Sequence, residues 1–186
     1  AKSVAQEFKA KLDAINIPAK IASMADYKLK QLQVESHVVI IVSTHGIGEA
    51  PDDAVSLHSF LAGNKAPKLT NLNFAVLGLG DTSYEFFCQT GKDFDKRLQD
   101  LGAARITERV DCDVDYDSVV ATWFETIIHQ VKDDLSAISA RSIAASLDVG
   151  TSVEAITQYT KKTPYTATLL ESLKITGRDS VKDIRH

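Results

Sequence analysis

The stretch Asn73–Cys88, with the sequence NFAVLGLGDTSYEFFC, decides the fold. It begins with an apolar run that ends at Leu79 and then changes at once to glycine, polar and aromatic residues. A strand whose apolar residues do not alternate with polar ones is buried on both faces, which is typical of a parallel sheet. The run Val38–Val42 (VVIIV) has the same character. The two runs therefore predict a parallel α/β sheet covered by helices.

Helical patterns alternate with these strands, as a doubly wound sheet requires. Apolar residues recur at helical spacing in four segments. These segments are Ala1–Ile15, Asp52–Leu61, Lys92–Leu101 and Val119–Leu135. Further strands are predicted at Ala19–Met24 and Ala104–Val110.

The composition changes after Leu135. Residues 136–163 are rich in Ser, Ala and Thr with weak periodicity, so they are predicted to form a flexible linker. Pro164 marks its end, and short strand patterns follow at Thr166–Leu169 and Leu173–Ile175. We therefore expect three parts: a domain at 1–135, a linker at 136–163 and the start of another region at 164–186.

Charge and cysteine content restrict the class of protein. The formal net charge of the 186 residues is -4, so the chain has no electrostatic attraction to nucleic acid or to anionic lipid. No apolar run approaches the roughly 20 residues of a membrane helix, and no secretory signal is visible. The two cysteines, with no CxxC, are expected to be reduced thiols of a cytoplasmic protein.

Two loops of unusual composition follow the predicted strands. In an open parallel sheet, ligands bind outside the carboxyl ends of the strands. The loop Ser43–Glu49 (STHGIGE) offers small residues and hydroxyl donors, and the loop Gly78–Cys88 (GLGDTSYEFFC) presents aromatic side chains. Phe86 and Phe87 also fit core packing, whereas Tyr84 lies within the loop itself. The pair of loops is typical of a site for a planar aromatic ligand.

Other polar residues have simpler explanations. His37, His58 and His129 fall in strand or helix patterns and are expected to be structural or solvated, and no His/Cys cluster has metal-ligand spacing. The acidic stretch Asp111–Asp117 precedes a helix and fits capping and compensation of the helix dipole, with a role at the ligand edge or in partner docking as the alternative.

Three segments carry a resemblance to a known family. GLGDTSYEFFCQTGKDFDKRL (Gly78–Leu98) closely resembles the third flavin loop and following helix of sulfite reductase flavoproteins, which belong to the diflavin reductases. STHGIGEAPDDAVSLHSFL (Ser43–Leu61) resembles their second flavin loop and helix. KITGRDSVKDIRH (Lys174–His186) is similar to the opening of their FAD-binding reductase region. The resemblance covers almost the whole chain and implies an FMN-binding, flavodoxin-like domain at 1–135.

The resemblance also implies a set of FMN-binding residues on the two loops. His45 stands where the family pattern has glutamine; both side chains donate a hydrogen bond, so binding is expected to survive with a different flavin potential. Asp81 is expected to disfavour an anionic reduced flavin, and Tyr84 to stack on its ring. One side of the site comprises Ser43, Thr44, His45 and Gly46; the other comprises Leu79, Gly80, Asp81, Thr82, Ser83, Tyr84, Glu85, Phe86, Phe87 and Cys88.

By resemblance, the chain is an electron-transfer module of NADPH-dependent sulfite reductase. FMN receives electrons from FAD, which NADPH reduces, and passes them singly to a haemoprotein subunit with sirohaem and an iron–sulfur cluster. Family members begin with a strand and a phosphate-binding loop, whereas this sequence starts inside the first helix. The expected sheet therefore lacks its first strand, which would lie between the strands near Ile21 and Ile40. The NADPH and FAD machinery is expected beyond His186.

Two alternatives remain open at this point. One is the FMN domain of another diflavin reductase, such as a cytochrome P450 reductase, against which the string Tyr84–Cys88 argues. The other is a flavodoxin-like interaction domain without a cofactor. A visible absorption spectrum separates the flavin-binding possibilities from the last one.

Overall fold

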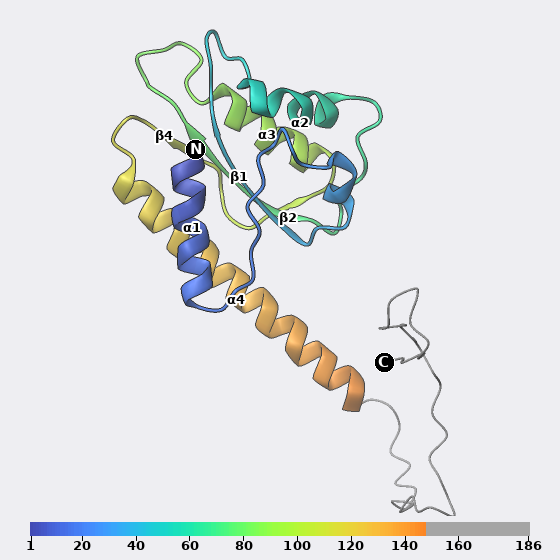
Figure 1. Cartoon of the computed structure of the whole chain (residues 1–186). Helices are drawn as coiled ribbons and strands as arrows, with labels where there is room; N and C mark the ends of the chain where they lie inside the picture. Colours follow the sequence, from blue (N-terminus) through green and yellow to red (C-terminus); the bar gives the residue numbers. More distant parts are fainter. Residues whose placement is uncertain (148–186) are drawn as a thin grey trace, which may run out of the picture. The chain divides into compact units, whose positions relative to one another are not determined.

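The chain divides into two units, Ala1–Ile143 and Ala144–His186. The computed structural model describes residues 1–147, which include the backbone of the whole first unit. This unit is a parallel sheet with helices on both faces (Figure 1). The predicted parallel α/β sheet with helices on both faces is therefore confirmed.

Two long strands, β1 (His37–Ser43) and β2 (Asn73–Leu79), form most of the sheet, with β2 inside it and β1 at its edge among residues 1–147. Strand β1 pairs in parallel with β2 along all seven residues, from His37 opposite Asn73 to Ser43 opposite Leu79. Two short strands, β3 (Ala104–Arg105) and β4 (Val110–Cys112), pair with the other edge of β2. Because β1 and β2 end at the same level, the loops that follow them leave the sheet side by side.

Helices cover the two faces in pairs. On one face lie α2 (Asp52–Ala62) and α3 (Gln89–Asp100), and on the other lie α1 (Lys2–Ala14) and α4 (Asp117–Leu147) (Figure 1). A short 3-10 helix, η1 (Leu29–Gln33), precedes β1 and adds Leu32 to the core on the α2/α3 side.

The apolar runs in the two long strands serve two cores at once. Alternate side chains of β2 point to opposite faces, so Phe74 and Val76 pack beneath α2 and α3, while Ala75 and Leu77 pack beneath α1 and α4. On the second face, the Phe8 ring of α1 stacks on Phe124 of α4 at a centroid distance of 4.6 Å. Burial on both faces explains why these strands do not alternate with polar residues.

Two predicted strands differ from the structure. Ala19–Met24 is not a strand but irregular chain, and within residues 1–147 the outer edge of β1 has no partner strand. A strand needs a neighbour for its backbone groups, and β1 pairs only with β2 in this part of the chain. The strand predicted at Ala104–Val110 is split into β3 and β4 by a bend at residues 106–109.

Helix α4 extends beyond the predicted domain end. It continues from Leu135 to Leu147, so the first residues of the segment expected as a linker are helical. The rest of that segment and the strands predicted at Thr166–Leu169 and Leu173–Ile175 lie outside the described residues. None of the helices in residues 1–147 has an apolar stretch of the length that a bilayer span requires.

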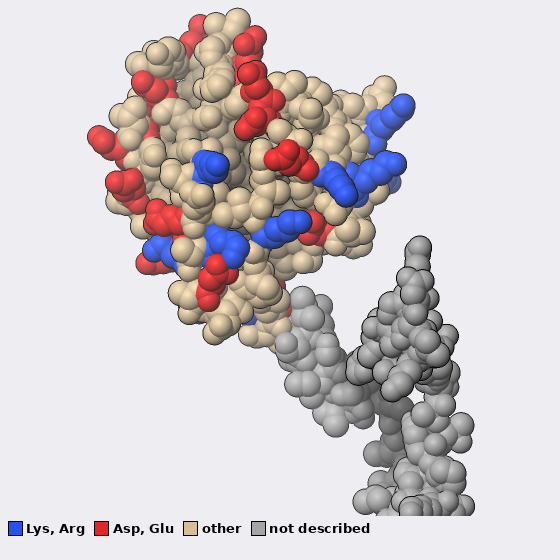
Figure 2. Space-filling view, viewed as in Figure 1, with Lys and Arg blue, Asp and Glu red and all other residues tan. Residues whose placement is uncertain are grey.

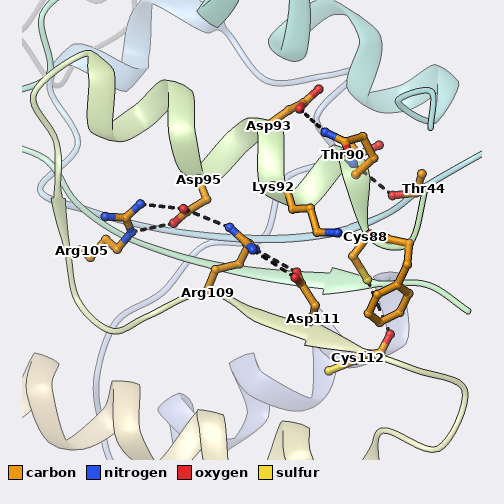
Figure 3. A network of polar contacts seen from close by, with 12 residues as sticks. Thr44, Cys88, Thr90, Lys92, Asp93, Asp95, Arg105, Arg109, Asp111 and Cys112 are labelled. Atoms are coloured by element: carbon orange, nitrogen blue, oxygen red, sulfur yellow. Dashed lines mark hydrogen bonds and ion pairs between the residues drawn. The ribbon is translucent and has the colours of Figure 1, made fainter. Parts of the chain in front are cut away.

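An ion-pair network fastens the bend to α3 (Figure 3). The Asp95 carboxylate of α3 is only 5% exposed and accepts hydrogen bonds from Arg105 Nε at 2.8 Å, Arg105 Nη2 at 2.6 Å and Arg109 Nη1 at 3.2 Å. Arg109 also binds both oxygens of Asp111 on β4, at 2.9 and 3.1 Å. The hydrogen bonds to Asp95 and Asp111 raise the pKa values of Arg105 and Arg109. The network therefore holds the edge of the sheet against α3.

The buried carboxylate gives a stability prediction. Asp95→Asn removes the charge that two guanidinium groups share, so we expect the free energy of unfolding to fall by about 2–4 kcal/mol. The matched control is Asp100→Asn on the same helix, which breaks an exposed ion pair with Lys96 and is expected to cost less than about 1 kcal/mol. Urea denaturation measures both values, and equal losses would contradict this account of the network.

Candidate functional site

Two loops at the carboxyl ends of β1 and β2 form the candidate site. The first loop is Ser43–Glu49 and the second loop is Leu79–Cys88. Ser43 and Leu79 are register partners, so the sheet itself brings the two loops together. All the residues predicted for the site lie on these two loops, at one end of the sheet.

The first loop is a tight turn with free donors. The backbone N–H of His45 donates to the Glu49 carbonyl at 2.9 Å, and the N–H groups of Gly48 and Glu49 donate back to the His45 carbonyl at 3.1 and 2.8 Å. Gly46 has a φ of 50°, which favours glycine. The N–H groups of Gly46 and Ile47 find no acceptor among residues 1–147, and the Ile47 side chain at the tip is 76% exposed. This loop therefore offers unpaired donors at the end of the sheet.

The second loop begins with a turn that its own side chains build. The Asp81 carboxylate accepts hydrogen bonds from the Ser83 N–H at 2.8 Å and the Ser83 hydroxyl at 2.6 Å. The Tyr84 N–H donates to the Asp81 carbonyl at 3.1 Å. An aspartate that bonds the backbone two residues ahead is a standard turn former. As a result, the Tyr84 side chain projects outward and is 65% exposed.

A second carboxylate fastens the same turn to the chain after β4. Asp113 accepts hydrogen bonds from the Thr82 N–H at 3.2 Å and the Thr82 hydroxyl at 2.5 Å, and also from the Val114 N–H at 2.8 Å. The hydrogen bond from the Thr82 hydroxyl, followed by those from the two backbone N–H groups, lowers the pKa of Asp113 below its ordinary value. Asp113 therefore stays ionised and holds the second loop at neutral pH.

The end of the second loop is buried and tightly packed. Cys88 has a φ of 52°, which is uncommon for a residue other than glycine, and its thiol lies 3.7 Å from the Cys112 carbonyl oxygen. Burial, and then the Asp111 carboxylate, raise the pKa of Cys88 to about 11. A Cβ on Gly80 would lie 2.9 Å from the Cys88 sulfur. Position 80 therefore requires glycine. Cys88 and Cys112 are both free cysteines.

The two predicted core phenylalanines differ in position. Phe86 is 40% exposed and reaches the first loop, because a Cβ on Gly48 would lie 3.0 Å from the Phe86 Cβ and Cγ atoms. Phe87 is half-buried, and the Lys92 ammonium lies 5.6 Å from the centroid of its ring. The core-packing alternative therefore applies to Phe87 more than to Phe86.

Sequence reasoning missed two residues of α3 that hold the loops (Figure 3). Thr90 is fully buried, donates its hydroxyl to the Glu49 carbonyl at 3.1 Å and donates its N–H to the Thr44 hydroxyl at 3.1 Å. Lys92 donates to the Phe87 carbonyl at 2.6 Å. A signal for Thr90 existed, because it lies four residues before Phe94 on the helix face that carries the buried apolar residues.

The histidines set aside in the sequence lie against aspartate side chains. His37 Nε2 lies 3.2 Å from Asp134, His58 Nε2 lies 2.9 Å from Asp93, and His129 pairs with Asp133 one helical turn away. Within the described part of the chain, no group of His, Cys, Asp and Glu side chains is arranged to hold a metal ion.

The chain is similar to two groups of known proteins. It is 53% identical over its full length to the sulfite reductase [NADPH] flavoprotein alpha-component of Photobacterium profundum and 51% identical to that of Vibrio parahaemolyticus. It spans 30% of the length of each relative. The resemblance to sulfite reductase flavoproteins is therefore confirmed across the whole chain.

Solved structures agree on the fold. A flavodoxin from Streptococcus pneumoniae TIGR4 is 21% identical with a TM-score of 0.62, and flavodoxin 2 from Bacillus cereus is 26% identical with a TM-score of 0.60. Each alignment covers 71% of this chain and 90% of the other. Residues 1–123 match the family model described as flavodoxin, which is well over half of the chain. The chain therefore belongs to the flavodoxin family.

Proposed function

We propose that this chain is the FMN-binding electron-transfer module of an NADPH-dependent sulfite reductase. The observation that carries the proposal is the pair of loops at the ends of β1 and β2, with unpaired N–H donors on one and exposed aromatic rings on the other. Membership of the flavodoxin family and the similarity to sulfite reductase [NADPH] flavoprotein alpha-components support it.

The chemistry of the two loops fits a flavin. A planar, apolar ring with polar edges needs an aromatic or apolar surface for its face and hydrogen-bond donors for its edge. Tyr84 supplies an exposed ring, and Ile47 and Phe86 supply exposed apolar surface. Gly46 and Ile47 supply N–H groups that have no acceptor in residues 1–147. The residues present therefore fit the cofactor that the family implies.

Each part of the site would have a distinct task. Ser43, Thr44, His45 and Gly46 would hold one side of the ring, and the residues from Leu79 to Cys88 the other, with Tyr84 stacked on its face. The bound flavin supplies the electron chemistry, and the protein orients it and sets the charge around it. Neutral, buried Cys88 takes no part as a nucleophile, because burial raises its pKa to about 11.

The end of the sheet that carries the site is acidic (Figure 2). The segments 43–53, 79–88 and 110–117 contain no Lys or Arg, while Lys and Arg side chains appear elsewhere on the same view. We propose that this end docks a basic face of the electron acceptor, the haemoprotein subunit with sirohaem and an iron–sulfur cluster that reduces sulfite to sulfide. The carboxylates of these segments are Glu49, Asp52, Asp53, Asp81, Glu85, Asp113, Asp115 and Asp117, together with Asp111, whose charge the adjacent Arg109 balances.

The rest of the reaction belongs to a longer polypeptide in this proposal. FAD and NADPH would bind to a reductase region that opens at residues 164–186, after a linker that ends near Thr163. FAD would pass electrons to FMN, and FMN would pass them one at a time to the haemoprotein. We also propose a cytoplasmic location, for which two free, buried thiols are suited.

The first test is FMN binding by the full-length protein. We expect a yellow protein, and we expect Tyr84→Ala to weaken FMN binding by about 30-fold, because a stacked aromatic ring contributes roughly 2 kcal/mol. Tyr84→Phe keeps the ring and should bind within about threefold of the unchanged protein. A colourless full-length protein that leaves added FMN unbound would refute the proposal and favour an interaction domain without a cofactor.

The charge of Asp81 should lower the midpoint potential of the bound flavin. Asp81→Asn removes a negative charge beside the site and should raise the flavin midpoint potential by about 20–40 mV. A unit charge several ångströms away in a partly solvated site contributes on the order of 0.5–1 kcal/mol to a one-electron couple. A redox titration measures the shift, with Asp100→Asn at the far end of α3 as the control. Equal potentials in the Asp81 variant and the unchanged protein would remove the hypothesis.

The third prediction concerns the hydrogen bonds between Asp113 and Thr82. Because the folded-state pKa of Asp113 lies below its ordinary value of 3.8, these bonds are present above that pH and are lost as the pH falls through the lowered pKa. Asp113→Ala should therefore weaken FMN binding several-fold, by the same factor at pH 7 and at pH 5. FMN titrations at both pH values measure the factor, and its disappearance at pH 5 would contradict the account.

A further inference from the structure

We infer that Thr90 is a positioning residue, which holds the first loop at the separation from the second loop that FMN binding requires. The inference rests on the proposed function and assigns to this site a buried residue that lies on neither loop. Thr90 would not touch the flavin; it would act through the main chain of the first loop.

Thr90 holds the first loop near both of its ends. Its N–H donates to the Thr44 hydroxyl at 3.1 Å, at the start of the loop (Figure 3). Its hydroxyl donates to the Glu49 carbonyl at 3.1 Å, at the end of the loop. The other hydrogen bonds of the turn join His45, Gly48 and Glu49 to one another, so they shape the turn but do not fix its position. The two hydrogen bonds with Thr90 connect the first loop to the body of the domain.

The first turn of α3 is itself firmly placed. A Cβ on Gly91 would lie 3.0 Å from the Gly78 Cα atom, so the helix touches the backbone of β2 at this point. Phe94 and Leu98 on the same face are completely buried. Thr90 has no exposed surface and cannot turn toward solvent without breaking this packing. The sheet therefore fixes Thr90, and Thr90 fixes the loop.

The same helical turn also holds the second loop. Lys92 donates to the Phe87 carbonyl at 2.6 Å, and Cys88 immediately precedes the helix. A few consecutive residues of α3 therefore hold both loops in position. A flavin ring bound between the loops needs one particular distance between them. The helical turn that positions both loops therefore controls the affinity for FMN.

Loss of the Thr90 hydroxyl should weaken binding through the first loop. In Thr90→Val, the Glu49 carbonyl loses one of its two donors and keeps the His45 N–H at 2.9 Å, so this bond no longer ties the end of the loop to α3. FMN binding would then require the loop to take up its position without this hydrogen bond to α3. The net loss of one hydrogen bond corresponds to a fall of about 3- to 10-fold in the affinity for FMN.

A substitution series in the full-length protein separates this role from simple packing. Thr90→Val and Thr90→Ala both remove the hydroxyl, whereas Thr90→Ser keeps it and removes only the methyl group. We expect the FMN Kd to rise about 3- to 10-fold for Thr90→Val and Thr90→Ala, and to stay within about twofold for Thr90→Ser. Thr126→Val removes an exposed hydroxyl that bonds the Thr122 carbonyl on α4 and is the matched control, with no expected change in Kd.

Titration of FMN and thermal unfolding of the FMN-free protein give the decisive comparison. If Val and Ala lower the melting temperature but leave the Kd unchanged, Thr90 is only structural and the inference is wrong. If Thr90→Ser weakens FMN binding as much as Thr90→Ala does, the packing of the side chain and not its hydroxyl determines the affinity. The inference is then also wrong. If Thr90→Val does not fold, the Ala and Ser variants still decide. If the unchanged protein fails to bind FMN, the proposed function falls, and this inference falls with it.

Discussion

The parallel pairing of β1 with β2 is the constraint on which the rest of the structure depends. Because Ser43 lies opposite Leu79, both strands end at one level, and the glycine-rich and aromatic loops emerge as neighbours. A shift of the register by one residue would turn the side chains of one strand to the opposite face. Burial on both faces opposes such a shift, since alternate residues of each strand serve different cores.

Close contact between the backbones of β2 and α3 fixes the position of the helix that holds the two loops. Gly78 and Gly91 bring β2 and α3 together, and Gly80 leaves room for Cys88 in a left-handed conformation. The first turn of α3 therefore has a fixed position beneath both loops. From it, Thr90 and Lys92 reach one loop each, while Asp113 fastens the outer side of the second loop through Thr82. These hydrogen bonds therefore hold in place the loops that carry the exposed aromatic rings of the site.

The sequence alone predicted the features that depend on strong local patterns. The uninterrupted runs at Val38–Val42 and Asn73–Leu79 predicted the paired strands, and the polar and aromatic residues after them predicted where the loops lie. The strand predicted at Ala19–Met24 was wrong, because an apolar stretch becomes a strand only where a neighbour accepts its hydrogen bonds. The bend at residues 106–109 could not be predicted either, since it depends on Arg105 and Arg109 meeting a buried aspartate distant in sequence.

The central claim is that one planar ligand contacts both loops together. The most direct test is a map of backbone amide chemical shifts in the full-length protein as FMN is added. The account predicts that the amide signals of Gly46 and Ile47 on the first loop and of Tyr84 on the second move at the same FMN concentration. Shifts confined to one loop, or found only on distant elements such as the outer face of α2, would contradict it.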